Sequence, residues 1–159
     1  MNDLLDKKAP EFSAPNQDNT PESLGIYKGS WVVLYFYPKD NTPGCTTEAD
    51  MFKEEHKEFT RLGAVVLGVS SDTVESHKAF KTKRSLPFSL VSDTDKAIAR
   101  MYGVWGEKEF LGKRYEGVLR TTFLISPEGV VAKVYDHVKP KEHAKEVLRD
   151  LERYTDDSK

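Results

Sequence analysis

The chain has 159 residues, 38% of them hydrophobic and 31% charged, which is typical of a folded, soluble domain rather than a disordered chain. A formal net charge of -2 gives no overall attraction to nucleic acid or to anionic membranes. The longest apolar run, 31–37, is far shorter than the roughly 20 residues of a membrane-spanning helix. The N-terminus lacks the basic-then-apolar order of a secretory signal, and one cysteine excludes a disulfide framework. We therefore expect a single domain over residues 1–159, located in the cytoplasm.

The first half of the chain predicts alternating strands and helices. Residues 1–30 are rich in turn-forming residues, and the β-branched and aromatic run 31–37 then predicts a strand buried on both faces. Apolar residues at helical spacing predict a helix over 43–62. A second buried strand over 64–71 and a helix over 72–84 complete this half.

The second half predicts a short strand, a short helix, a long loop, two strands joined by a tight turn, and a last helix. In chain order these cover 88–91, 93–101, 102–118, 120–126, 130–135 and a helix from about Pro140. We place Ala97, Ile98 and Met101 on the buried face of the short helix. Strands that alternate with helices favour parallel pairing, and the late hairpin adds antiparallel strands. The expected fold class is α/β, with a central mixed β-sheet flanked by helices.

The single cysteine, Cys45, follows a helix-start signal. Thr42 suits the N-cap, where its hydroxyl would accept a hydrogen bond from a free backbone N–H. Pro43 then takes the first helical position, where its missing N–H costs little. Cys45 becomes the third helical residue, within the field of the helix N-terminus, which favours a thiolate.

The helix terminus alone is too weak to ionise this thiol fully. A free thiol titrates near ~8.5, and lowering its pKa below ~6.5 needs about 2.7 kcal/mol. A helix N-terminus supplies ~0.3–1 kcal/mol, rarely ~2 kcal/mol. A nearby cation must add the rest, because Glu48, one helical turn from Cys45, acts in the opposite direction. The alternative is an inert cysteine that packs in the core as a small hydrophobe.

The residues around Cys45 resemble the active-site pattern of the peroxiredoxins. The pattern Pro38-x-x-x-Thr42-x-x-Cys45 is present, and the whole string 37–46 is similar to the Q-type group, also called bacterioferritin comigratory proteins. Further motifs similar to that group follow in the expected order across residues 8–155: Ala9-Pro10-Glu11-Phe12, Gly29 with 32–37, Pro87-Phe88-x-Leu90-x-Ser92-Asp93, and 120–125. The resemblance implies a thioredoxin-like fold and thiol-dependent reduction of hydrogen peroxide and organic hydroperoxides.

The resemblance also implies a role for each site residue. Cys45 matches the cysteine that attacks peroxide, Thr42 the hydroxyl that hydrogen-bonds it, and Pro38 the proline that shields it. Arg120 matches a guanidinium that reaches the site from a distant strand, and it would be the missing cation. Glu48 matches an acid that orients the site's hydrogen bonds, although a solvated helix position is an equal alternative. We expect no cofactor, and no metal, since the 4 histidines show no metal-ligand spacing.

One position departs from the family pattern. Many Q-type members carry a resolving cysteine five residues after the peroxide-attacking cysteine. This chain has Asp50 at that position, and the sequence alone does not show whether Asp50 is natural or an engineered replacement. We therefore expect a one-cysteine cycle, in which Cys45 becomes a sulfenic acid that an external thiol reduces. A thioredoxin-like protein, glutathione and another small thiol are the candidate reductants. The resemblance implies a monomer or weak homodimer.

Two other functions compete with the peroxidase hypothesis. One is a disulfide reductase or isomerase on a similar fold, against which the absence of Cys-x-x-Cys argues. The other is a binding module, such as a peroxide sensor or a chaperone. Steady consumption of peroxide with an added thiol separates the peroxidase from the binding module.

Overall fold

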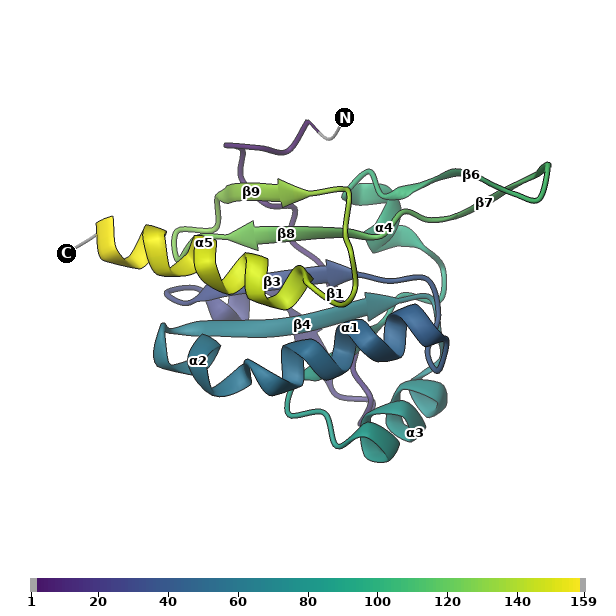
Figure 1. The fold of residues 1–159 in the computed structure, drawn as a ribbon, viewed down its shortest axis with the longest axis horizontal. Helices are drawn as coiled ribbons and strands as arrows, with labels where there is room; N and C mark the ends of the chain where they lie inside the picture. Colours follow the sequence, from purple (N-terminus) through teal and green to yellow (C-terminus); the bar gives the residue numbers. More distant parts are fainter. Residues whose placement is uncertain (1–2, 158–159) are drawn as a thin grey trace.

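The computed structural model describes residues 3–157 and is built on a five-stranded sheet (Figure 1). The strand order is β5-β4-β3-β8-β9. These strands are β3 (Trp31–Phe36), β4 (Ala64–Ser70), β5 (Ser89–Ser92), β8 (Thr121–Ile125) and β9 (Val131–Tyr135). β3, β4 and β5 pair in parallel, whereas β8 pairs antiparallel with both β3 and β9. The sheet is mixed, as predicted.

Helices and short segments cover the two faces of this sheet. The helices are α1 (Pro43–Glu54), α2 (His56–Arg61), α3 (Val74–Arg84), α4 (Ala97–Met101) and α5 (His143–Asp157). The N-terminal segment adds β1 (Ser13–Pro15), β2 (Pro21–Ser23) and a 3-10 helix, η1 (Leu24–Tyr27). Within residues 3–157, no helix combines the length and the hydropathy needed to cross a bilayer.

β3 divides the core into two hydrophobic clusters. Its residues Val33 and Tyr35 pack with α1, α2 and α5, whereas Val32, Leu34 and Phe36 pack with α4 and the N-terminal segment. This alternation is what a strand buried on both faces requires, because successive side chains point to opposite faces. The end of β3 therefore emerges between two packed layers, and the loop to α1 starts there.

The helix predicted over 43–62 is interrupted. Glu55, with φ -93° and ψ 3°, separates α1 from α2. No glycine or proline marks this break, so composition did not indicate it. Phe52 and Phe59 nevertheless share one buried side, which is the spacing that predicted the helix.

The loop predicted over 102–118 is wrong, because a β-hairpin occupies it. β6 (Trp105–Phe110) pairs antiparallel with β7 (Lys113–Val118), and Figure 1 shows the pair projecting from the body of the molecule. The turn residues Leu111 and Gly112 both have positive φ, 53° and 80°, as in a two-residue hairpin turn. β7 is largely exposed and charged, so the apolar alternation that predicts a half-buried strand is missing.

Two helix starts also differ from the prediction. α4 begins at Ala97 rather than near Asp93, because the Asp93 carboxylate accepts hydrogen bonds from two backbone N–H groups of the helix. Ile98 is buried as predicted, but Ala97 and Met101 are exposed, because the helix turns Ile98 and Ala99 towards the core instead. α5 begins at His143, not near Pro140.

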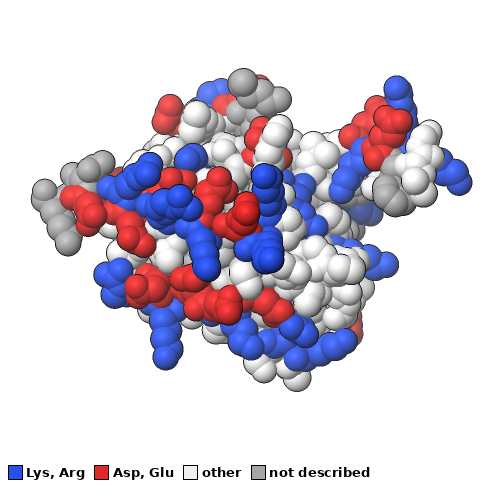
Figure 2. All heavy atoms as spheres, in the orientation of Figure 1, with Lys and Arg blue, Asp and Glu red and all other residues white. Residues whose placement is uncertain are grey.

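Surface charge is mixed on the face that Figure 2 displays. Lys and Arg side chains are interspersed with Asp and Glu along α5. This agrees with the formal net charge of -2 for the whole chain.

Candidate active site

Cys45 lies in the first turn of α1, just beyond the carboxyl end of β3. Pro38, half-buried, starts the connecting loop, and Thr42 is the N-cap residue with extended backbone, φ -83° and ψ 153°. The predicted capping hydrogen bond is wrong, because the Thr42 hydroxyl donates to the Lys39 carbonyl at 2.8 Å instead. A hydroxyl that donates its hydrogen in this way keeps its oxygen lone pairs as acceptors for a ligand.

The pairing of β3 with β8 brings Arg120 to this turn. Phe36, the last residue of β3, pairs with Thr121, the first residue of β8, so the preceding residue Arg120 lies where the chain leaves β3. Its Nη2 is 3.3 Å from Cys45 Sγ. Cys45 is only 1% exposed, so this contact is largely shielded from bulk water. A charge-assisted contact in such a site is stronger than one in water.

Glu48 completes the site from the next turn of α1. It is fully buried, and its Oε1 accepts a hydrogen bond from Arg120 Nη1 at 2.6 Å. The solvated alternative for Glu48 is therefore wrong. Burial raises the pKa of Glu48 above its ordinary value of 4.5 to about 7, although the charge of Arg120 acts to lower it. Glu48 can therefore exchange a proton near neutral pH.

We expect Glu48→Gln to remove a pH dependence from the free energy of unfolding. Because the folded-state pKa exceeds the ordinary value, the folded protein holds a proton on Glu48 between pH 4.5 and about 7 that the unfolded chain has lost. This contribution to stability is full below pH 4.5 and is lost as pH rises through about 7. Its size is on the order of 3 kcal/mol. Glutamine keeps an acceptor for Arg120 but cannot titrate.

Denaturant unfolding of both proteins over this pH range measures the effect. The wild-type free energy minus that of the variant should fall with rising pH and level off above neutrality. A difference that stays constant with pH would contradict the raised pKa of Glu48.

Gly44 gives the guanidinium room to approach α1. A Cβ at this position would lie 3.3 Å from Arg120 Nη2 and 3.7 Å from Pro140 Cγ. The first of these separations is tighter than an ordinary van der Waals contact. A side chain at position 44 would therefore force the Arg120 guanidinium to shift by a few tenths of an ångström.

Lys108 is a second cation near the site that no sequence motif indicated. It lies on β6, and its Nζ donates to the Val118 carbonyl at 3.0 Å. Burial lowers the pKa of Lys108, the charge of Arg120 lowers it further, and the charge of Cys45 opposes both. Lys108 reaches the site only because residues 102–118 form a hairpin, so no local pattern could reveal it.

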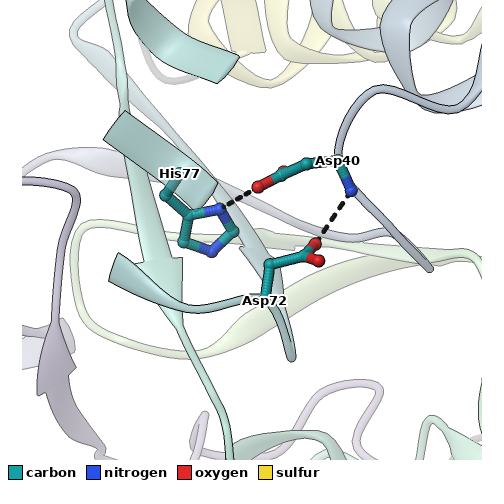
Figure 3. Close-up of side chains that lie close together, drawn as sticks. All are labelled: Asp40, Asp72 and His77. Atoms are coloured by element: carbon teal, nitrogen blue, oxygen red, sulfur yellow. Dashed lines mark hydrogen bonds and ion pairs between the residues drawn. The ribbon is translucent and has the colours of Figure 1, made fainter. Parts of the chain in front are cut away.

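A largely buried polar cluster includes a residue of the loop between β3 and α1 (Figure 3). One side-chain oxygen or nitrogen atom from each of Asp40, Asp72 and His77 lies within 4.8 Å of the other two. Both ring nitrogens of His77 are already hydrogen-bonded, Nδ1 to the Asp40 carboxylate and Nε2 to the Val91 carbonyl. The cluster is therefore a connected hydrogen-bond network rather than an open set of metal ligands.

Asp50, at the position of the resolving cysteine in many Q-type members, forms an ion pair between two helices. Its Oδ1 accepts from Arg84 Nε at 3.1 Å, and its Oδ2 contacts Arg84 Nη2. This pair links α1 to the end of α3. Because Cys45 is the one cysteine in the sequence, an intrachain disulfide is impossible.

Comparison with known proteins agrees with this geometry. Residues 5–134 match the AhpC/TSA family, and peroxiredoxin Bcp of Bacillus subtilis is 45% identical over 147 residues, covering 92% of this chain and 94% of that protein. The structure of Xanthomonas campestris peroxiredoxin Q aligns with a TM-score of 0.86 and 44% identity over 91% of each chain. The bacterioferritin comigratory protein of the same organism aligns with a TM-score of 0.86 and 43% identity over 91% of this chain and 92% of that one. These neighbours confirm the predicted thioredoxin-like fold class, and the chain belongs to the AhpC/TSA family and to its peroxiredoxin Q group.

Proposed function

We propose that this peroxiredoxin reduces hydroperoxides through a one-cysteine cycle at Cys45. The observation that carries the proposal is the 3.3 Å contact between Arg120 Nη2 and Cys45 Sγ. A guanidinium stays charged at any physiological pH, so its proximity favours the thiolate, which is the nucleophilic form. The related Xanthomonas campestris protein was studied for alkyl peroxide reduction, which supports organic hydroperoxides as substrates alongside hydrogen peroxide.

In the first step, the Cys45 thiolate attacks the terminal oxygen of the hydroperoxide. A sulfur–oxygen bond forms as the oxygen–oxygen bond breaks, and the negative charge passes from sulfur to the leaving oxygen. That oxygen takes a proton and departs as an alcohol or water, and Cys45 becomes a sulfenic acid. Arg120 can stabilise the charge throughout its transfer, because it already contacts the sulfur.

Thr42 is suited to hold the peroxide in line with the sulfur. Its hydrogen is donated to the Lys39 carbonyl, so its oxygen can accept the hydrogen of a peroxide O–H group. The backbone N–H of Cys45, in the first helical turn, provides a donor for the other oxygen. Holding both oxygens converts the attack into a nearly unimolecular step.

We assign supporting roles to two further residues. Glu48 fixes the orientation of Arg120 through the 2.6 Å contact with Nη1. Pro38, at the start of the loop, shields the thiolate from water. These roles concern geometry and solvent exclusion, so neither residue exchanges atoms with the peroxide.

The second step needs thiols from other molecules. The sulfenic acid reacts with one thiol to give a mixed disulfide and water, and a second thiol then releases Cys45 and leaves as a disulfide. A thioredoxin-like protein, glutathione or another small thiol can supply both. Because Cys45 is only 1% exposed, the reductant must enter the site as a slender group, or α1 must open.

We also propose that the protein works in the cytoplasm as a monomer or weak homodimer. A single reactive cysteine without a disulfide suits a reducing compartment. Sedimentation at increasing protein concentration measures the self-association.

Steady-state consumption of hydrogen peroxide and of an organic hydroperoxide tests the function. We expect one equivalent to be consumed without thiol, and continued consumption once thioredoxin, glutathione or dithiothreitol is added. A binding module or sensor would show no sustained turnover with any of the three thiols. A disulfide reductase would instead reduce insulin, which we expect this protein not to do, because it has one cysteine.

A further inference from the structure

A buried aspartate–histidine pair supports the loop that carries the active-site threonine. Asp40 lies on this loop, between Pro38 and Thr42, and its side chain is 1% exposed. His77, on α3, has a fully buried side chain, and its Nδ1 is 2.8 Å from Asp40 Oδ2. Figure 3 shows the His77 ring directed at the Asp40 carboxylate.

Asp40 is held through its side chain and its backbone at the same time. Oδ1 accepts a hydrogen bond from the Tyr37 hydroxyl at 2.6 Å, and Oδ2 accepts one from the Ser76 hydroxyl at 2.8 Å, in addition to the His77 contact. The backbone N–H of Asp40 donates to Asp72 Oδ2 at 2.8 Å. Three of these four partners, Asp72, Ser76 and His77, belong to α3 or the turn that precedes it. The loop is thereby fixed to the start of α3.

Both ring nitrogens of His77 are used in hydrogen bonds. Its Nε2 is 3.0 Å from the Val91 carbonyl, which can only accept a hydrogen bond. Its Nδ1 faces a carboxylate that already accepts from two hydroxyls. His77 therefore connects the Asp40 carboxyl group to the Val91 carbonyl through its two ring nitrogens. Removing either partner leaves buried hydrogen-bonding groups of the other unsatisfied, which strongly disfavours the arrangement.

The residues on either side of Asp40 determine how Thr42 is presented. Lys39 supplies the carbonyl that receives the Thr42 hydroxyl hydrogen at 2.8 Å. Asn41 has a left-handed backbone, φ 64°, which is uncommon for a residue other than glycine. Such conformations persist where the surrounding structure over-determines them, and Asp40 is the anchored residue between these two neighbours.

We propose that the Asp40–His77 pair is a positioning device for the peroxide, because it holds the 38–42 loop so that the Thr42 hydroxyl keeps the peroxide in line with Cys45. Asp40 and His77 act through the loop and do not touch the substrate, so both are positioning residues. This inference rests on the proposed peroxidase function.

Two reactions of Cys45 distinguish an effect on the position of the peroxide from an effect on the fold or on the ionisation of the thiol. Oxidation by hydrogen peroxide needs the thiolate and an aligned peroxide, whereas alkylation by iodoacetamide needs the thiolate but no peroxide alignment. We expect Asp40→Asn and His77→Gln each to slow oxidation by up to about a hundredfold, the cost of a small misplacement of reacting groups. Alkylation should slow far less. The double variant, whose two amides can bond each other without a buried charge, should regain part of the oxidation rate.

The chain offers a matched control pair on its surface. Asp136 and His137 form an aspartate–histidine contact of 3.1 Å, but their side chains are 59% and 93% exposed. Asp136→Asn and His137→Gln should leave both rates unchanged. Ser76→Ala is the test variant if Asp40→Asn fails to fold, because it removes one hydrogen-bond donor to Asp40 and keeps both members of the pair. It should slow oxidation selectively, by a smaller factor.

The outcomes distinguish this inference from the proposed function. A wild-type protein that hydrogen peroxide does not oxidise would overturn both. If the wild type is oxidised and the folded Asp40 and Ser76 variants are oxidised at the same rate, the positioning role alone is overturned. Equal slowing of oxidation and alkylation would also overturn it, since the pair would then act on the fold or on the thiolate. Selective loss of oxidation, with partial recovery in the double variant, supports it.

Discussion

Arg120→Ala is expected to slow the oxidation of Cys45 by hydrogen peroxide on the order of a hundredfold, the usual effect of removing one donor that stabilises developing charge. The substitution removes the Nη2 group that lies 3.3 Å from the sulfur and the positive charge that favours the thiolate. It also leaves Glu48 buried without its ion-pair partner. Arg120→Lys keeps the charge but loses the planar fork that contacts Cys45 and Glu48 together. The oxidation rate of this variant should therefore fall between those of the wild type and Arg120→Ala.

Stopped-flow oxidation under excess peroxide gives these rates directly. Arg61→Ala is a matched control, because Arg61 also forms an ion pair with a glutamate, Glu58, at 3.1 Å but is 60% exposed. Exposed pairs of this kind contribute little, so the control should oxidise at the wild-type rate. An Arg120→Ala protein that folds and oxidises as fast as the control would exclude the assigned role of Arg120.

Cys45→Ser should abolish peroxide turnover entirely. A serine hydroxyl is hardly ionised at neutral pH and is a poor nucleophile without an adjacent base, so it cannot attack the oxygen–oxygen bond. The exchange of sulfur for oxygen is small, and the variant should remain folded although Cys45 is buried. The measurement is peroxide consumption with each thiol, alongside thermal unfolding to check the fold. Turnover above the rate without protein would show that another group performs the reaction.

Local patterns in the sequence were sufficient to place Cys45. The apolar run of β3, followed by Thr42, Pro43 and Gly44, predicts a strand that leads into a helix start, and the structure has both. Arg120 is different, because it reaches Cys45 from 75 residues away through the register of β3 with β8. Periodicity does not specify that register, and the resemblance to peroxiredoxins supplied Arg120 instead.

The missed features depend on contacts between distant segments. Lys108 lies near the site because exposed, charged residues form a hairpin, and no apolar alternation in the sequence predicts that hairpin. The burial of Glu48 could not be read from α1, because a charged residue is buried there only when a partner such as Arg120 arrives from another strand. The Asp40–His77 pair likewise joins a loop to a helix 37 residues away.

Intact-mass spectrometry after one equivalent of hydrogen peroxide, without thiol, shows whether Cys45 is the group that peroxide oxidises. We expect a gain of one oxygen atom at Cys45, capture of that product by a sulfenic-acid reagent, and return to the starting mass when a thiol is added. An unchanged mass, or an oxygen carried by one of the 3 methionines while Cys45 stays reduced, would contradict this expectation.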